Sequence, residues 1–197
     1  MSDVPSEITR DLAPTGKLRA TINFGNPVLA QKDPGAGEPR GVSVELAREL
    51  GKRLGVEVEL FTFDTAGKAF AALQSKACDV GFLAIDPARA ADLALTAPYV
   101  TIEGAYLVRS TSPLRSIEAF DREGVRIAAG KNTAYDLHLS RTLKHATLVH
   151  AATSAAAIEL FVRNELDAAA GLRQPLLAYA AANPGLRVID GRFMVIE

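Results

Sequence analysis

Arg89 lies close to a predicted helix start, and its guanidinium is a side chain suited to binding anions. Asp86 and Pro87 precede it, and this pair is typical of a helix start: Asp accepts hydrogen bonds at the N-cap and Pro fits the first helical position. A guanidinium can hold a carboxylate through two parallel hydrogen bonds, which lysine cannot reproduce. Arg89 is therefore a candidate carboxylate-binding residue. In the competing interpretation it caps the end of the helix or pairs with a neighbouring acid such as Asp92.

A second candidate is the turn formed by Gly130, Lys131, Asn132 and Thr133, which opens a predicted helix extending to about Leu143. The backbone N–H groups at a helix start, together with the helix dipole, favour an anion, and the Asn132 and Thr133 side chains can add donors. An ordinary helix cap is the alternative interpretation of the same residues.

Two further charged residues adjoin predicted strands. Glu103 lies in an extended run over residues 99–108, where an acid can hold an ammonium group or simply remain a solvated charge. Arg173 follows a predicted strand over residues 168–172. A cation at this position repels an ammonium and attracts a carboxylate.

These residues are positioned by short β-rich runs that alternate with helical patterns, which is typical of α/β units with a largely parallel sheet. The pattern predicts helices over residues 44–54, 66–76, 86–93, 154–164 and 175–182, with Thr153 and Pro175 at helix starts. It predicts strands over residues 18–24, 56–63, 80–85, 125–129, 147–150 and 168–172, with two closing strands around 188 and 194–196. The run over residues 80–85 reads as a strand buried on both faces.

Composition excludes several classes of protein. The chain has 197 residues, 48% of them hydrophobic and 23% charged, which is ordinary for a folded protein of one large or two small domains. The net charge is −1 with no basic cluster, so nucleic acid is not an expected partner. The three histidines lack the spacing of a metal site, and no phosphate-binding loop or nucleophile elbow occurs, so no metal or cofactor is expected.

Three blocks together carry a resemblance to a known family. They are Gly-Val-Ser-Val-Glu-Leu-Ala at 41–47, Cys-Asp-Val-Gly-Phe at 78–82 followed by Arg89, and Leu-Thr-Ala-Pro-Tyr at 95–99. Their order and spacing resemble the amino-acid branch of the type II periplasmic solute-binding proteins of ABC transporters. The resemblance implies two α/β lobes, residues 1–100 and 101–197, with a hinge near 98–106 and the ligand in the cleft between them. It also implies that Arg89 binds the ligand's α-carboxylate, that the turn at 130–133 assists, and that the partner is a transporter permease.

The chain departs from the family pattern around the expected ligand. The segment before Arg89 almost lacks the hydroxyl side chains of the family, but its residue Ala84 is still expected beside the ligand. Arg173 stands near the position of the family's ammonium-binding Asp. Phe24 and Asn26 stand in the region of its stacking aromatic residue, so both are expected ligand contacts, with Phe24 as the candidate for stacking. Two ligand classes therefore remain: a zwitterion held by Arg89 and Glu103, which the family favours, or an anionic acid held by Arg89 and Arg173.

Other functions and settings remain as alternatives. Some cyclohexadienyl dehydratases and related lyases share this fold, and Glu103 is then the candidate acid or base. A ligand-sensing domain is another possibility. The resemblance implies a periplasmic protein, whereas the chain shows no signal peptide, which leaves a cytoplasmic location open. The chain reads as short of the family's C-terminal return segment. Either the sequence is a piece of a longer protein, or self-association through an incomplete first lobe is expected.

Overall fold

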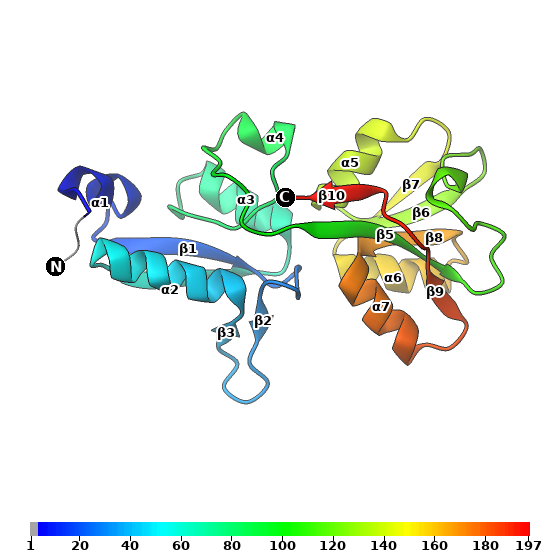
Figure 1. The fold of residues 1–197 in the computed structure, drawn as a ribbon, viewed down its shortest axis with the longest axis horizontal. Helices are drawn as coiled ribbons and strands as arrows, with labels where there is room; N and C mark the ends of the chain where they lie inside the picture. Colours follow the sequence, from blue (N-terminus) through cyan, green and yellow to red (C-terminus); the bar gives the residue numbers. More distant parts are fainter. Residues whose placement is uncertain (1–3) are drawn as a thin grey trace. The chain divides into compact units, whose positions relative to one another are not determined.

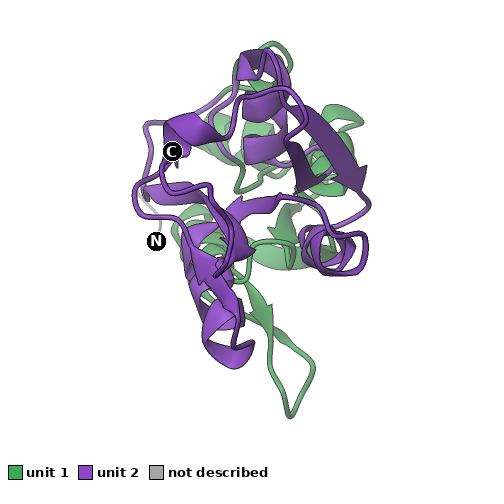
Figure 2. Ribbon diagram, turned by 90° about the vertical axis from the view of Figure 1, so that its right-hand side faces the viewer, with its two compact units in different colours: residues 1–83, 87–94 green, residues 84–86, 95–197 purple. Residues whose placement is uncertain are grey.

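The computed structural model describes residues 4–197, which form two compact units (Figure 2). The first unit runs to Leu83 and also includes Pro87–Ala94, and the second consists of Ala84–Asp86 and Leu95–Glu197. The chain therefore changes unit after Leu83, Asp86 and Ala94. The expected division after residue 100, with a hinge near residues 98–106, stays a prediction.

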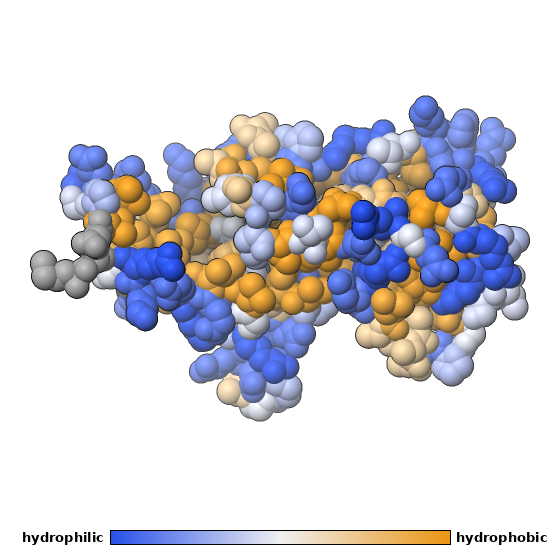
Figure 3. All heavy atoms as spheres, in the orientation of Figure 1, coloured by the Kyte–Doolittle hydropathy of each residue, from blue (hydrophilic) through white to orange (hydrophobic). Residues whose placement is uncertain are grey.

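The first unit is built on two long parallel strands (Figure 1). β1 and β4 pair in register from Lys17 opposite Glu57 to Asn23 opposite Phe63. A small antiparallel hairpin, β2 with β3, projects from this unit, and its exposed residues are mostly hydrophilic (Figure 3). The elements of the unit are α1 (Ser6–Leu12), β1 (Lys17–Asn23), β2 (Gln31–Lys32), β3 (Pro39–Arg40), α2 (Val42–Leu54), β4 (Glu57–Phe63), α3 (Ala66–Gln74) and α4 (Pro87–Ala90).

Helix α2 confirms the helix expected at residues 44–54 and begins two residues earlier. Its buried face includes Val44, Ala47 and Leu54, which recur at helical spacing. Gly55 ends the helix in the left-handed conformation with φ 72°, as the Gly after the last apolar residue predicted. Val44 packs with Ile22 of β1 in a small core that positions the carboxyl end of that strand.

The prediction of a strand over residues 80–85 is wrong. Only Val80 bridges to β1, through Ala20, and Gly81 and Ile85 are exposed. The two ends of this run belong to different units: the Val80 carbonyl accepts from Thr21 N in the first, and Ile85 N donates to the Glu197 carbonyl in the second. The apolar run therefore cannot form one continuous strand.

Asp79 joins Val80's segment to β1 through Arg19. Its carboxylate accepts bonds from Arg19 N at 2.9 Å, Nε at 3.0 Å and Nη2 at 2.6 Å. Burial alone raises the pKa of Asp79, but the hydrogen bonds from Arg19 outweigh it and hold the pKa below its ordinary value. The pair thus stabilises the fold while the carboxyl is ionised.

The pair of Asp79 and Arg19 makes the free energy of unfolding depend on pH. Because the folded-state pKa is depressed, the contribution of Asp79 is present above its unfolded-state pKa of about 3.9 and is lost as the pH falls through the folded value. We expect Asp79→Asn to lower the free energy of unfolding at pH 7, and the deficit relative to the unmodified protein to shrink by pH 3. Urea denaturation of both proteins at the two pH values measures this, and a deficit that stays constant would contradict it.

The second unit holds a six-stranded sheet in the order β10-β5-β8-β6-β7, with β9 also pairing with β5 (Figure 1). β6 runs parallel to β7 and β8, while β5 is antiparallel to β8, β9 and β10. The sheet is therefore parallel except for β5, as the sequence predicted. Its elements are β5 (Ile102–Arg109), the short 3-10 helix η1 (Ile117–Ala119), β6 (Arg126–Gly130), α5 (Ala134–Thr142), β7 (Thr147–Ala151), α6 (Ser154–Arg163), β8 (Ala168–Leu172), α7 (Arg173–Ala182), β9 (Leu186–Val188) and β10 (Met194–Ile196).

Small residues at the centre of this sheet let helices pack closely against it. Alanines of β5, β6 and β8 form one buried cluster with Phe161 of α6 and Leu176 of α7. Helix α6 begins where expected, with the Thr153 side chain accepting from Ala156 N. Within residues 4–197, no helix combines the length and apolar character needed to cross a membrane.

Candidate ligand-binding site

In the second unit, the candidate residues lie at one edge of the sheet, where the parallel strands end. Helices α5, α6 and α7 each begin within a few residues of the carboxyl ends of β6, β7 and β8. β5 starts at the same edge because it is antiparallel, and Gly104 pairs with Leu172, so Glu103 lies level with Arg173. In open α/β sheets, ligands bind outside the carboxyl ends of the strands. The topology thus brings Glu103, Arg173 and the turn at 130–133 to one edge.

The turn at 130–133 is held by its own hydrogen bonds. The Thr133 hydroxyl donates to the Gly130 carbonyl at 2.8 Å and accepts from Asp136 N at 3.1 Å. Asn132 adopts φ 60°, and its N–H donates to Asp136 Oδ2 at 2.7 Å. The Thr133 hydroxyl proton and the Asn132 N–H are therefore engaged within the turn. Lys131 and Asn132 are exposed to solvent.

Asp136 is the residue of this turn that our sequence analysis missed. It is 3% exposed, and its second carboxylate oxygen lies 2.7 Å from His150 Nε2 of β7. A Thr followed three residues later by an acid is the signature of a capping box, so the spacing of Thr133 and Asp136 carried a usable signal. The buried carboxylate links the turn to the neighbouring strand.

Gly130 lets the turn approach the start of α6. A Cβ at this position would lie 2.8 Å from Ser154 N and 3.0 Å from the Thr153 carbonyl carbon. Tyr135 adds a second link, because its hydroxyl lies 2.6 Å from Ser154 Oγ. The starts of α5 and α6 are therefore fixed against each other at the sheet edge.

Glu103 lies between two arginines. Its Oε1 is 2.6 Å from Arg192 Nη1 and its Oε2 is 2.8 Å from Arg173 Nε. The hydrogen bond from Arg192, aided by Arg173, keeps the pKa of Glu103 below its ordinary value despite partial desolvation. Arg192 was missed by our sequence analysis, and no local signal marks it, because it reaches Glu103 only through the pairing of β10 with β5.

In the first unit, Phe24 and Asn26 follow the carboxyl end of β1. Phe24 N donates to the Phe63 carbonyl at 2.8 Å, and the Lys32 ammonium lies 5.5 Å from the centre of the Phe24 ring. The Asn26 side chain accepts from Val28 N at 3.2 Å and so shapes the loop. Both residues are half-buried. A role in ligand contact stays a prediction for each.

Arg89 belongs to the short helix α4 of the first unit and is only 3% exposed. A guanidinium is seldom buried to this extent without anionic or hydrogen-bonding neighbours. The helix starts at Pro87, as the sequence predicted. Asp92, the acid of the competing interpretation, accepts a bond from Gln74 Nε2 at 2.8 Å.

Ala84 belongs to the second unit and is half-buried. Two residues further on, Asp86 Oδ2 lies 2.8 Å from Arg141 Nη2 of α5. This ion pair holds the segment Ala84–Asp86 in the second unit. The expected role of Ala84 beside the ligand stays a prediction.

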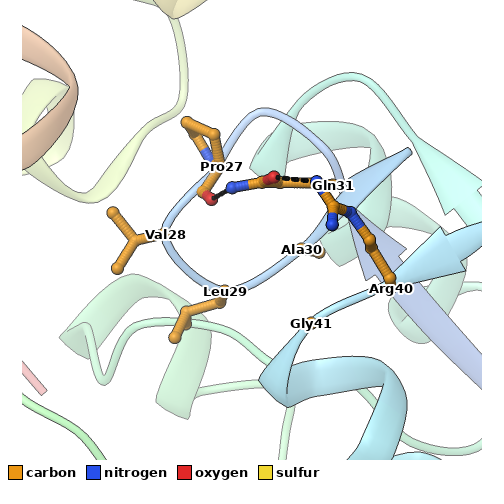
Figure 4. Close-up of a pocket in the computed structure, with 7 residues that line it drawn as sticks. All are labelled: Pro27, Val28, Leu29, Ala30, Gln31, Arg40 and Gly41. Atoms are coloured by element: carbon orange, nitrogen blue, oxygen red, sulfur yellow. Dashed lines mark hydrogen bonds between the residues drawn. The ribbon is translucent and has the colours of Figure 1, made fainter. Parts of the chain in front are cut away.

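A shallow cavity of about 240 Å³ lies at the base of the β2–β3 hairpin (Figure 4). The polar groups that line it are hydrogen-bonded to each other. Gln31 Nε2 donates to the Pro27 backbone carbonyl at 2.7 Å, and Arg40 Nη2 donates to Gln31 Oε1 at 3.2 Å. These bonds hold the hairpin base together.

The histidines have individual structural contacts. His150 contacts Asp136, and the ring of His138 stacks at 6.1 Å on that of Phe193, where burial lowers its pKa. Across the described part of the chain, no three His, Cys, Asp or Glu side chains gather as metal ligands do.

The fold defines a class: two α/β units, of which the second carries charged groups at the carboxyl ends of its strands, where ligands bind in open α/β sheets. The family model for bacterial extracellular solute-binding proteins, family 3, matches residues 21–186. The chain belongs to this family. A comparison with curated protein sequences gave no match.

Several solved structures share this fold. Holo ArgBP from T. maritima is 23% identical with a TM-score of 0.78, over 98% of this chain and 83% of that one. A putative ABC transporter binding component from Wolinella succinogenes, complexed with lysine, is 21% identical with a TM-score of 0.75, over 92% and 79%. An ancestral amino acid-binding protein, a precursor of cyclohexadienyl dehydratase, is 25% identical with a TM-score of 0.76, over 96% and 82%.

Proposed function

We propose that the protein binds a small carboxylate-bearing solute, of the amino acid type, as the solute-binding component of an ABC-type uptake system. Membership of the extracellular solute-binding family is the observation that carries this proposal. Similar structures contain arginine, lysine or glutamine, which share a carboxylate next to an amino group but differ in their side chains. The family description supports a place of action outside the cytoplasm. A structural relative described as a putative binding component of an ABC transporter supports a transporter permease as the partner.

Arg89 is the proposed carboxylate ligand of the first unit, and the turn at 130–133 is its proposed counterpart in the second. A guanidinium shielded from bulk water binds a carboxylate more strongly than an exposed one, because screening is weaker. The Gly130 contact and the Asp136 bonds give the turn a fixed shape before any ligand arrives. Groups held in place before binding lose little entropy when the ligand arrives.

A lyase on the same fold is the second candidate, and one structural relative is a precursor of cyclohexadienyl dehydratase. Catalysis requires an acid or base with a pKa near the working pH. Glu103 was the candidate group, but Arg192 lowers its pKa away from neutrality. This electrostatic setting favours binding over proton transfer.

Thermal denaturation against a panel of amino acids, opines and mono- and dicarboxylates tests the proposed function. At 100 times its dissociation constant, a ligand adds about 2.7 kcal/mol, which corresponds to roughly 5–10 °C at this chain length. We expect a shift of this size with at least one carboxylate-bearing solute and none with matched sugars. A recovered solute that is chemically unchanged supports a binding protein, whereas turnover favours the lyase.

A further inference from the structure

We propose that the ligand carries a second acidic group and that Arg173 binds it in place of the Glu103 carboxylate. This inference rests on the proposed function and names its substrate class. It selects an anionic acid, such as an acidic amino acid or a dicarboxylate, over a neutral or cationic amino acid.

The first observation is the charge of the group formed by Glu103, Arg173 and Arg192. Two guanidiniums share one carboxylate, with contacts of 2.8 Å and 2.6 Å, so the group carries a net charge of +1. An ammonium approaching Glu103 would meet both cations at close range and be repelled. The same field attracts a carboxylate.

The second observation is the unsatisfied hydrogen-bonding capacity of Arg173. Its side chain is 20% exposed, and its buried Nε–H lies near Glu103 without an aligned hydrogen bond to it. A buried donor without an aligned acceptor is costly, and a well-placed carboxylate would relieve that cost. The Glu103 carboxylate thus neutralises the charge of Arg173 but does not offer its Nε–H an aligned acceptor.

Helix stability does not explain the cation at this position. Arg173 is the first residue of α7, where the positive end of the helix dipole disfavours a cation and favours an acid. The side chain of the preceding residue, Leu172, provides no cap, whereas Thr133 and Thr153 cap α5 and α6. Ligand binding therefore explains an arginine at this site better than stabilisation of the helix does.

The position of Arg173 also fits the site already described. β8 pairs with β6 on one side and β5 on the other, so Arg173 shares its sheet edge with the turn at 130–133. Lys131 of that turn is exposed and adds positive charge to the edge. The Asp136 carboxylate at this edge is buried and held by His150.

Two variants are expected to act in opposite directions. Arg173→Gln removes the proposed cation and should weaken acid binding by at least about tenfold, with partial recovery in Arg173→Lys. Glu103→Gln removes the competing carboxylate and should tighten acid binding severalfold. A purely structural role for the pair would not give effects of opposite sign. Arg122→Gln is the control, since Arg122 is exposed and precedes β6 at the opposite edge.

Calorimetry on the intact chain at constant ionic strength, with circular dichroism to check folding, supplies the test. The probes are succinate, glutarate, adipate and L-glutamate against L-glutamine, L-lysine and L-arginine. Tighter binding of an acidic probe, with the opposite effects of the two variants, supports the proposal. Preference for glutamine, lysine or arginine, with weaker binding in Glu103→Gln, overturns it while leaving the solute-binding function intact. If the acidic probes and the three amino acids all fail to bind, both proposals fall.

Discussion

Replacing Arg89 with alanine is expected to lower the affinity for the ligand by on the order of 2–5 kcal/mol, which is roughly 30-fold to several thousand-fold. The ligand carboxylate would lose a bidentate, charge-assisted pair in a setting where Arg89 is only 3% exposed. Arg89→Lys keeps the charge but not the planar pair of donors, so we expect an intermediate loss. Titration calorimetry with the tightest solute of the panel measures both variants.

A matched control separates binding from folding. Arg48 on α2 is an exposed arginine that pairs with Glu45 three residues away, and Arg48→Ala should leave the affinity unchanged. Thermal melting of each variant shows whether Arg89→Ala remains folded. A folded Arg89→Ala protein that binds with unchanged affinity would remove Arg89 from the site.

The helices of this protein were the most predictable part of its fold because their signals are local. Thr153 accepts from a backbone N–H three residues on, and Gly55 ends α2 in the left-handed conformation, as their types and positions predicted. The strand over residues 168–172 was also placed with its observed bounds. By contrast, α1 was missed because it buries no side chain and so shows no apolar periodicity.

Predictions failed where one signal fits two structures. Pro175 was read as the first residue of α7, but the helix starts at Arg173, and a proline is tolerated throughout the first turn, whose N–H groups lack intrahelical partners. The apolar run at residues 80–85 looks the same in a buried strand as in a segment passing between units. Only tertiary pairing, Val80 with Ala20 and Ile85 with Glu197, distinguishes the two.

The sequence named individual candidate residues for the site but not how they are arranged. Glu103 and Arg173 were selected from the sequence as alternative ligand-binding groups, one for an ammonium and one for a carboxylate. The structure shows that they contact each other, because β5 and β8 pair with Gly104 opposite Leu172. Register between strands far apart in sequence is set by the whole sheet, so a reading of local patterns cannot supply it.

Replacing Asp136 with alanine is expected to lower the free energy of unfolding by about 1–3 kcal/mol, the usual cost when a buried hydrogen-bonding group loses its partners. The change removes the acceptor of Asn132 N and the contact with His150, each at 2.7 Å. Asp136→Asn keeps an acceptor oxygen for Asn132 and should lose less. Urea denaturation of the two variants gives the values.

Glu159→Ala is the control for a lost acid, since Glu159 is exposed on α6 and its removal should change stability by no more than about 0.5 kcal/mol. Equal stability of Asp136→Ala and the unmodified protein would show that Gly130 and Thr133 hold the turn without the carboxylate. Because the turn is the proposed carboxylate contact of the second unit, we also expect Asp136→Ala to weaken ligand binding. A destabilised variant with full affinity would instead assign the turn to folding alone, leaving Arg173 as the binding group of that sheet edge.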